Sequence, residues 1–401
     1  MNTQELITLG QEVTMNTFNR QEIVLVKGQG VYVEDLDGKK YIDFISGIAC
    51  NVLGHADKGF VDYLSKQAAN LIHVSNLFWH ENGIRLADKL SQLSDLDKTF
   101  FANSGTEANE AAIKLARKWG REVKGPDAYE IISMNQSFHG RTLASLTATG
   151  QSDLHTAFKP LPAGFKYVDF NDGNALQEAV NERTCAILLE VIQGEGGVNT
   201  VTDEFIAVIN ALQEKENILV IVDEIQTGIG RTGTVFAFQQ TDLNPDIITL
   251  AKGLGGGIPV GALVAKDHVA NHFQPGDHGT TFGGNPLATA AGNYILSAIE
   301  ERDLLSNVNN LSQYIINEIS SWQLDVVEEI RGQGFLIGLK LSQPVGEVIE
   351  SAAKHGLLIT SAKDNVIRLL LALNISRQEV DEGLSKLKCV LLDDDSFNDI
   401  S

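Results

Sequence analysis

From about residue 59 onward, short apolar runs alternate with amphipathic helical patterns, and this alternation restricts the possible fold more than any other feature. The run 218–222, Ile-Leu-Val-Ile-Val, is apolar at every position, as expected of a strand that is buried on both faces. Such strands need helices on both sides of a mainly parallel sheet. The pattern therefore predicts an α/β fold with strands at 99–102, 130–133, 185–191, 218–222, 247–250 and 262–265.

The two ends of the chain differ from its middle. Near the N-terminus, two β-rich runs flank Asp37-Gly38, a dipeptide that favours a hairpin turn because it tolerates positive φ. Near the C-terminus, Ser376 followed by Glu379 is a capping box that predicts the start of a helix. We expect a large domain at 59–300 and a smaller α+β domain built from 1–58 and 301–401, with strands at 30–35, 39–44, 335–341, 357–360 and 366–373 and a helix at 304–322.

Composition narrows the classes of partner. With 31 Lys and Arg against 52 Asp and Glu, the net charge of -21 repels nucleic acid and anionic membranes, so neither is an expected partner. The chain starts without a signal-peptide pattern, and no uncharged stretch approaches the ~20 residues that span a bilayer. Cys50, Cys185 and Cys389 lie far apart, which favours a reducing, cytoplasmic location. The histidines show no metal-ligand spacing, so we expect no metal.

Two glycine-containing segments could bind phosphate. Residues 228–233 match GxGxxG, but they run into Thr-Val-Phe-Ala-Phe, whereas a dinucleotide site needs a helix at this point. A different purpose for these glycines is therefore the better interpretation. In the second segment, Asn103-Ser-Gly-Thr106 follows a strand and precedes a helix, whose first N–H groups could hold an anion. The simpler alternative is an ordinary helix start with Thr106 as its cap.

Asp223 and Lys252 each follow an apolar strand, at the edge of the sheet where α/β enzymes bind ligands. Taken singly, they could be a helix cap and a solvated loop lysine. Together they meet the needs of pyridoxal phosphate chemistry. A lysine forms a Schiff base with the cofactor aldehyde, and an aspartate keeps the pyridine nitrogen protonated so that the ring accepts electrons.

Further motifs carry a resemblance that spans almost the whole chain. They are NSGTEANE at 103–110, SFHGRTLAS at 137–145, VIQGEGGV at 191–198, DEIQTGIGRTG at 223–233 and GTTFGGNPLATAAG at 279–292. The series resembles the class III aminotransferases of fold type I, and among them most closely the acetylornithine aminotransferases. The resemblance implies a pyridoxal-phosphate enzyme that works as a homodimer with shared active sites.

The resemblance also implies a role for individual residues. Lys252 is the Schiff-base lysine, and Asp223 pairs with the pyridine nitrogen; both are the implied catalytic residues. Phe138 and Ile225 stack on the two ring faces, and Gln226 contacts the phenolic oxygen. The remaining implied cofactor-binding residues are Ser104, Gly105, Thr106 and Glu224, together with Thr281 from the neighbouring subunit.

Two arginines are implied to recognise substrates, which suits the bidentate fork of a guanidinium. Arg141 resembles the clamp for the α-carboxylate of the amino donor, and Thr280 is a further substrate contact. Arg368 resembles the arginine that binds 2-oxoglutarate, with Glu195 covering it during the first half-reaction. Ile48 replaces a tyrosine found in ornithine aminotransferases, which favours an N-acylated donor.

The implied reaction is δ-amino transfer from N2-acetylornithine to 2-oxoglutarate, giving N-acetylglutamate 5-semialdehyde and glutamate, a step of arginine biosynthesis. The alternatives are another class III aminotransferase that uses ornithine, succinylornithine, 4-aminobutyrate or succinyldiaminopimelate. A racemase or aminomutase on the same scaffold, or a non-catalytic binding protein, fits the residues less well. Three positions depart from the family pattern: Val191 replaces a proline, Phe18 replaces a tyrosine, and the segment after Ile367 reads RLLLAL.

Overall fold

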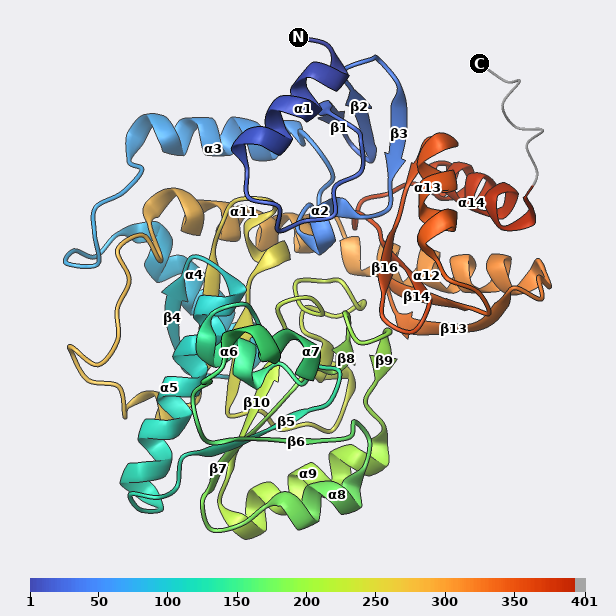
Figure 1. Ribbon diagram of the computed structural model, residues 1–401. Helices are drawn as coiled ribbons and strands as arrows, with labels where there is room; N and C mark the ends of the chain where they lie inside the picture. The colour runs from blue at the N-terminus through green and yellow to red at the C-terminus, as the bar shows by residue number, and fades with distance from the viewer. Residues whose placement is uncertain (394–401) are drawn as a thin grey trace.

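The computed structural model describes residues 1–393, and its centre is a seven-stranded sheet (Figure 1). All its strands run parallel to one another except β12, which is antiparallel to both neighbours. This confirms the predicted α/β class. The strand order is β4 (Lys98–Ala102), β12 (Gly261–Ala265), β11 (Ile247–Leu250), β10 (Leu219–Asp223), β7 (Thr184–Leu189), β5 (Glu130–Met134) and β6 (Phe165–Val168).

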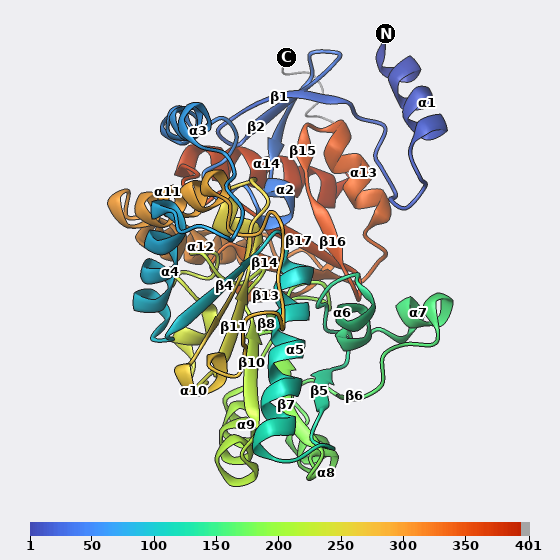
Figure 2. The same ribbon diagram turned by 90° about the vertical axis from the view of Figure 1, so that its left-hand side faces the viewer.

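Both faces of this sheet are buried, as the apolar runs predict. In β10, Val220 and Val222 belong to one hydrophobic core, whereas Leu219 and Ile221 belong to another. Figure 2 shows helix α5 on one side of the strands and α4 on the other. The helices of this part are α3 (Lys58–Asn70), α4 (Glu81–Ser94), α5 (Gly105–Val123), α6 (Leu143–Ala148), α7 (Ser152–His155), α8 (Gly173–Ala179), α9 (Asp203–Glu216), α10 (Asp267–Ala270) and α11 (Pro286–Glu301).

A smaller α+β part is formed by both ends of the chain. The parallel pairing of β15 with β3 joins the C-terminal region to the N-terminal hairpin, in which Gly38 takes φ +86°. One sheet has the order β1 (Leu25–Gln29), β2 (Tyr32–Asp35), β3 (Lys40–Asp43) and β15 (Leu357–Leu358). The other is β13 (Val327–Gln333), β14 (Leu336–Leu341), β17 (Val366–Leu370) and β16 (Thr360–Ala362), and β8 (Ile192–Gln193) pairs with β9 (Asn199–Thr200). The helices are α1 (Thr3–Val13), α2 (Ser46–Ala49), α12 (Leu304–Ser321), α13 (Gly346–Lys354) and α14 (Arg377–Leu392).

Several local predictions can be compared with this structure. The capping box at Ser376 and Glu379 is present at the start of α14. Strands β6 and β13 were not predicted, because their sequences FKYV and VEEIRGQ mix polar with apolar residues. The predicted strand 357–360 is wrong as one unit: β15 and β16 lie in different sheets. The domain boundaries at 58 and 300 stay a prediction. Within the described residues, no helix is both long and apolar enough to cross a bilayer.

The GxGxxG segment serves the packing of the two parts. No α-helix follows it, in agreement with the rejection of a dinucleotide site. Its Arg231 is fully buried and donates from Nη1 to the carbonyl oxygens of Phe335 and Leu371, which lie in the C-terminal region. Gly233 takes φ +98°, where a Cβ would lie 2.1 Å from the Asn309 side chain. These glycines therefore allow close contact between the parts.

Candidate active site

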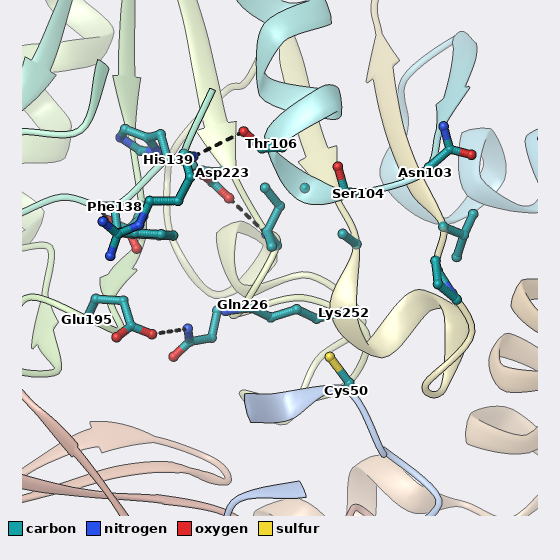
Figure 3. Close-up of a pocket in the computed structure, with 18 of the residues that line it drawn as sticks. Cys50, Asn103, Ser104, Thr106, Phe138, His139, Glu195, Asp223, Gln226 and Lys252 are labelled. Carbon is teal, nitrogen blue, oxygen red and sulfur yellow. Dashed lines mark hydrogen bonds and ion pairs between the residues drawn. The ribbon is translucent and has the colours of Figure 1, made fainter. Parts of the chain in front are cut away.

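A cavity of about 430 Å³ opens at the carboxyl ends of the parallel strands. Strand β10 ends at Asp223, β7 is followed by Glu190, and β11 is followed by Ala251 and Lys252. All four residues line the cavity, together with residues from the start of α5 and the loop after β5. The topology thus brings together side chains that lie far apart in sequence (Figure 3).

The Asp223 carboxylate is held by three donors. Its Oδ2 accepts hydrogen bonds from Asn109 Nδ2 and His139 Nδ1, both at 2.8 Å, and its Oδ1 accepts one from the Ile225 N–H at 3.0 Å. Since Oδ2 already has two donors, Oδ1 is the oxygen with greater capacity for a ligand. This arrangement suits a carboxylate that pairs with a protonated ring nitrogen in the cavity.

Lys252 is partly buried and takes φ +39°, in the left-handed region. Its Nζ makes no hydrogen bond or ion pair with any residue in 1–393. Burial lowers the pKa of this ammonium, and Arg368 adds to the effect, whereas the negative charge of Glu195 opposes it. A lysine in this state supplies a neutral amine more readily than a solvated one.

The start of α5 faces the same cavity. Ser104, not Thr106, is the N-cap residue, and its hydroxyl accepts from the Glu107 N–H at 3.3 Å. Thr106 Oγ1 instead lies 2.6 Å from Ser145 Oγ. The unpaired N–H groups of the first turn and the positive end of the helix dipole can hold a phosphate. A Cβ at Gly105 would lie 2.8 Å from the Ile225 side chain. Glycine therefore lets the first turn of α5 lie close to Ile225.

Arg368 and Glu195 form an ion pair beside the cavity. Arg368 Nη1 donates to Glu195 Oε1 at 2.5 Å and to Gln226 Oε1 at 3.0 Å. Gln226 Nε2 in turn donates to Glu195 Oε1 at 3.2 Å, the contact drawn in Figure 3. Burial raises the pKa of Glu195, but Arg368, Lys252 and the Gln226 hydrogen bond together lower it by more, so the pKa lies below its usual value. The Arg368 guanidinium is therefore covered by an ionised carboxylate.

The structure places the other predicted residues as follows. Phe138, Ile225 and Arg141 line the cavity, and the Arg141 guanidinium lies 5.4 Å from the centre of the Phe138 ring. Thr280 accepts from Asn103 Nδ2 at 3.0 Å, just outside the lining. Three further residues, Thr281, Ile48 and Phe18, are exposed and outside the lining.

Glu224 is also outside the cavity. Its carboxylate accepts from Thr227 Oγ1 at 2.5 Å and from the Phe238 N–H at 2.7 Å. Burial raises its pKa to about 7, although these donors oppose the shift. In the folded chain, the Glu224 side chain is thus engaged with the segment after β10 and not with the cavity.

We expect Glu224 to make stability fall as the pH rises from about 4.5 to 7. In this window the unfolded chain releases the proton while the folded chain keeps it. The free energy of unfolding therefore falls by about 3 kcal/mol across the window. Glu224→Gln should therefore reduce the fall in Tm between pH 5 and pH 8 by about 3 °C, as measured by thermal unfolding. Glu350→Gln, an exposed helical control, should leave the fall unchanged. Equal falls in all three proteins would contradict the assignment.

Three cavity-side residues were not predicted from the sequence: Asn109, His139 and Glu190. Asn109 is fully buried on α5, four residues after Gly105 and so on the same helix face. An amide on a buried, alanine-rich face was the signal that could have revealed it. His139 and Glu190 lie inside the quoted motifs or beside them, but only the fold shows what they contact.

Comparisons with known proteins agree with this fold. The crystal structure of ornithine aminotransferase from Toxoplasma gondii superposes with a TM-score of 0.94 at 29% identity, covering 98% of this chain and 96% of that one. Acetylornithine aminotransferase from Elizabethkingia anophelis gives a TM-score of 0.87 at 32% identity, covering 98% and 100%. The fold is therefore that of the aminotransferases.

Sequence comparison defines the family. The class III aminotransferase model matches residues 15–391. Acetylornithine aminotransferase from Caldanaerobacter subterraneus subsp. tengcongensis is 48% identical, covering 96% of this chain and 99% of the relative, and that from Methanocaldococcus jannaschii is 43% identical, covering 96% and 98%. The chain belongs to the class III aminotransferases, as its motifs imply.

Proposed function

We propose that the chain transfers the δ-amino group of N2-acetylornithine to 2-oxoglutarate with pyridoxal phosphate as cofactor. The observation that carries the proposal is the Arg368–Glu195 pair beside Lys252 and Asp223, because an arginine held in reserve fits a second, dicarboxylate substrate. Relatives at 41–48% identity named acetylornithine aminotransferase support the choice of donor.

The residues of the cavity fit the cofactor. Lys252 can offer its amine to the cofactor aldehyde, Asp223 Oδ1 can accept from the pyridine N–H, and the start of α5 can hold the phosphate. Phe138 and Ile225 supply apolar walls for the ring. When bound, the cofactor withdraws electrons from the carbon that bears the amino group.

This chain's own side chains would then move the protons. Lys252, with its lowered pKa, can take a proton from the substrate carbon and return it as a general acid. Asp223 would stay fixed by Asn109 and His139, so that no reorientation is needed during the reaction. Glu195 would remain on Arg368 while the donor reacts and leave it when a second carboxylate enters.

We further propose that a homodimer completes the site. Thr281 is exposed and does not line the cavity of its own chain, which is consistent with a role in a neighbouring subunit's site. The aromatic residues Phe78, Trp79 and Phe282 are also largely exposed, and they offer apolar area for such a contact. A cytoplasmic location is part of the same proposal.

Different jobs for the two arginines give a testable result. Arg141→Ala should slow the acetylornithine half-reaction by roughly 10- to 100-fold, because a charge-assisted contact to a carboxylate is worth about 1.5–3 kcal/mol. Arg368→Ala should slow the 2-oxoglutarate half-reaction to a similar extent, since it also leaves Glu195 unpaired where the diacid must bind. Single-turnover absorbance measurements follow each half-reaction separately. Arg377→Ala, on the exposed face of α14, is the control.

A donor screen tests the substrate itself. Enzyme loaded with pyridoxal phosphate is mixed with acetylornithine, ornithine, succinylornithine, 4-aminobutyrate or succinyldiaminopimelate, and the loss of the cofactor's absorbance is timed. Fastest conversion by acetylornithine supports the proposal, and faster conversion by another amine replaces it with that donor.

Equal slowing of both half-reactions in the Arg141→Ala and Arg368→Ala variants would refute the separate roles of the two arginines and favour a racemase.

A further inference from the structure

Glu190 is a buried acid of the cavity that the proposed reaction does not use. It is the first residue after β7, is 6% exposed, and its Oε2 accepts the Phe138 N–H at 3.1 Å. Its second oxygen, Oε1, has no hydrogen-bond partner in the described part of the chain, and the residue lines the cavity. Glu190 thus touches the loop that carries Phe138 and also faces the ligand space.

The neighbours of Glu190 make a second negative charge unfavourable. Val222 and Leu189 are partners in the parallel pairing of β10 and β7, so Asp223 and Glu190 follow at adjacent strand ends. Within 1–393, no Lys, Arg or His forms an ion pair with Glu190. Burial, the charge of Asp223 and more weakly that of Glu195 raise its pKa well above the usual value, whereas the Phe138 N–H and Lys252 oppose the shift.

We propose that Glu190 serves the site as a neutral carboxylic acid that positions Phe138, with its O–H directed into the cavity. In this state Oε2 can still accept the Phe138 N–H, and no anion is added beside Asp223. The inference rests on the proposed function, because it concerns the ring-stacking residue and the partner of the pyridine nitrogen. Glu190 is a positioning residue in this account and not a proton-transfer group.

Replacement by glutamine separates the shape of the acid from its charge. Glu190→Gln keeps an acceptor for Phe138 and a donor for the cavity, so kcat/KM at pH 7.5 and the Kd of the apoenzyme for pyridoxal phosphate should stay within about 3-fold of the wild type. Glu190→Ala removes both contacts. It should lower kcat/KM and raise the Kd for pyridoxal phosphate by at least about 10-fold each, the effect of one lost hydrogen bond that leaves its partner unpaired. Cofactor affinity is measured by titrating the apoenzyme and following tryptophan fluorescence.

The pH profile provides a second, independent measurement. In the wild type, ionisation of Glu190 should lower kcat/KM toward alkaline pH, whereas Glu190→Gln should lack this loss. Glu130→Gln is the matched control: a buried acid outside the cavity, whose replacement should leave cofactor affinity unchanged. Tm values show whether any variant is merely unfolded, and the glutamine variant remains informative if the alanine variant does not fold.

The possible failures are distinguishable. If Glu190→Gln is as defective as Glu190→Ala while its Tm is unchanged, the site needs an ionised Glu190 and the inference is wrong. If Glu190→Ala binds cofactor and turns over like the wild type, Glu190 positions nothing, and the inference is also wrong. Failure of the proposed function would give different results: the wild-type chain itself would not bind pyridoxal phosphate, or Asp223→Asn would bind the cofactor and react normally.

Discussion

Lys252→Ala is expected to abolish aminotransfer, lowering kcat by about 10⁴-fold or more. The variant loses the amine that lines the cavity, and with it both the covalent attachment of the cofactor and the group that moves the proton. Burial lowers the pKa of Lys252, which makes its neutral amine accessible. A solvated lysine stays protonated at neutral pH and therefore cannot take over the role. The measurement is steady-state turnover, with cofactor content determined on the same sample.

Borohydride reduction followed by peptide mapping provides the direct check on Lys252. The wild type should carry the pyridoxyl label on this residue alone, and Lys252→Ala should carry none. Lys340→Ala, a partly exposed lysine of β14, should be labelled at Lys252 and react like the wild type. A label on a different lysine of the unaltered protein would overturn the assignment.

Asp223→Asn is expected to lower kcat by at least about 100-fold, which corresponds to about 2.7 kcal/mol of transition-state stabilisation. The carboxylate receives hydrogen bonds from Asn109, His139 and the Ile225 N–H, so an amide must turn its NH₂ group toward a donor or toward the ligand. Either orientation weakens the support of a protonated ring nitrogen. Turnover and cofactor Kd are measured together, because weaker binding also lowers the rate.

Asp246→Asn is the matched control for this experiment. Asp246 is also a buried aspartate next to the central sheet, but it accepts from the Val220 N–H and pairs with Lys266, away from the cavity. Its replacement should lower Tm and leave kcat per folded enzyme unchanged. Near-normal turnover by Asp223→Asn would mean that another residue supports the ring nitrogen.

The sequence by itself determined the architecture and many of the residues at the site. Runs such as 218–222 are apolar at every position, and only a strand covered on both faces buries all of them, so the α/β class followed from local pattern. Lys252 and Asp223 could be paired because strand ends in such sheets meet at one edge. The motifs then identified the family across almost the full chain.

Only the tertiary structure decided how these groups act on one another. Asn109 and His139 both bind Asp223, although they precede it in the sequence by 114 and 84 positions. No local sequence pattern encodes contacts over such separations. Glu224 and Asp223 are neighbours in sequence, yet only Asp223 lines the cavity, because successive residues at a strand end point in different directions. The neutral state inferred for Glu190 has the same origin. Burial and the charge on an adjacent strand set the pKa of an acid, and both exist only after the chain has folded.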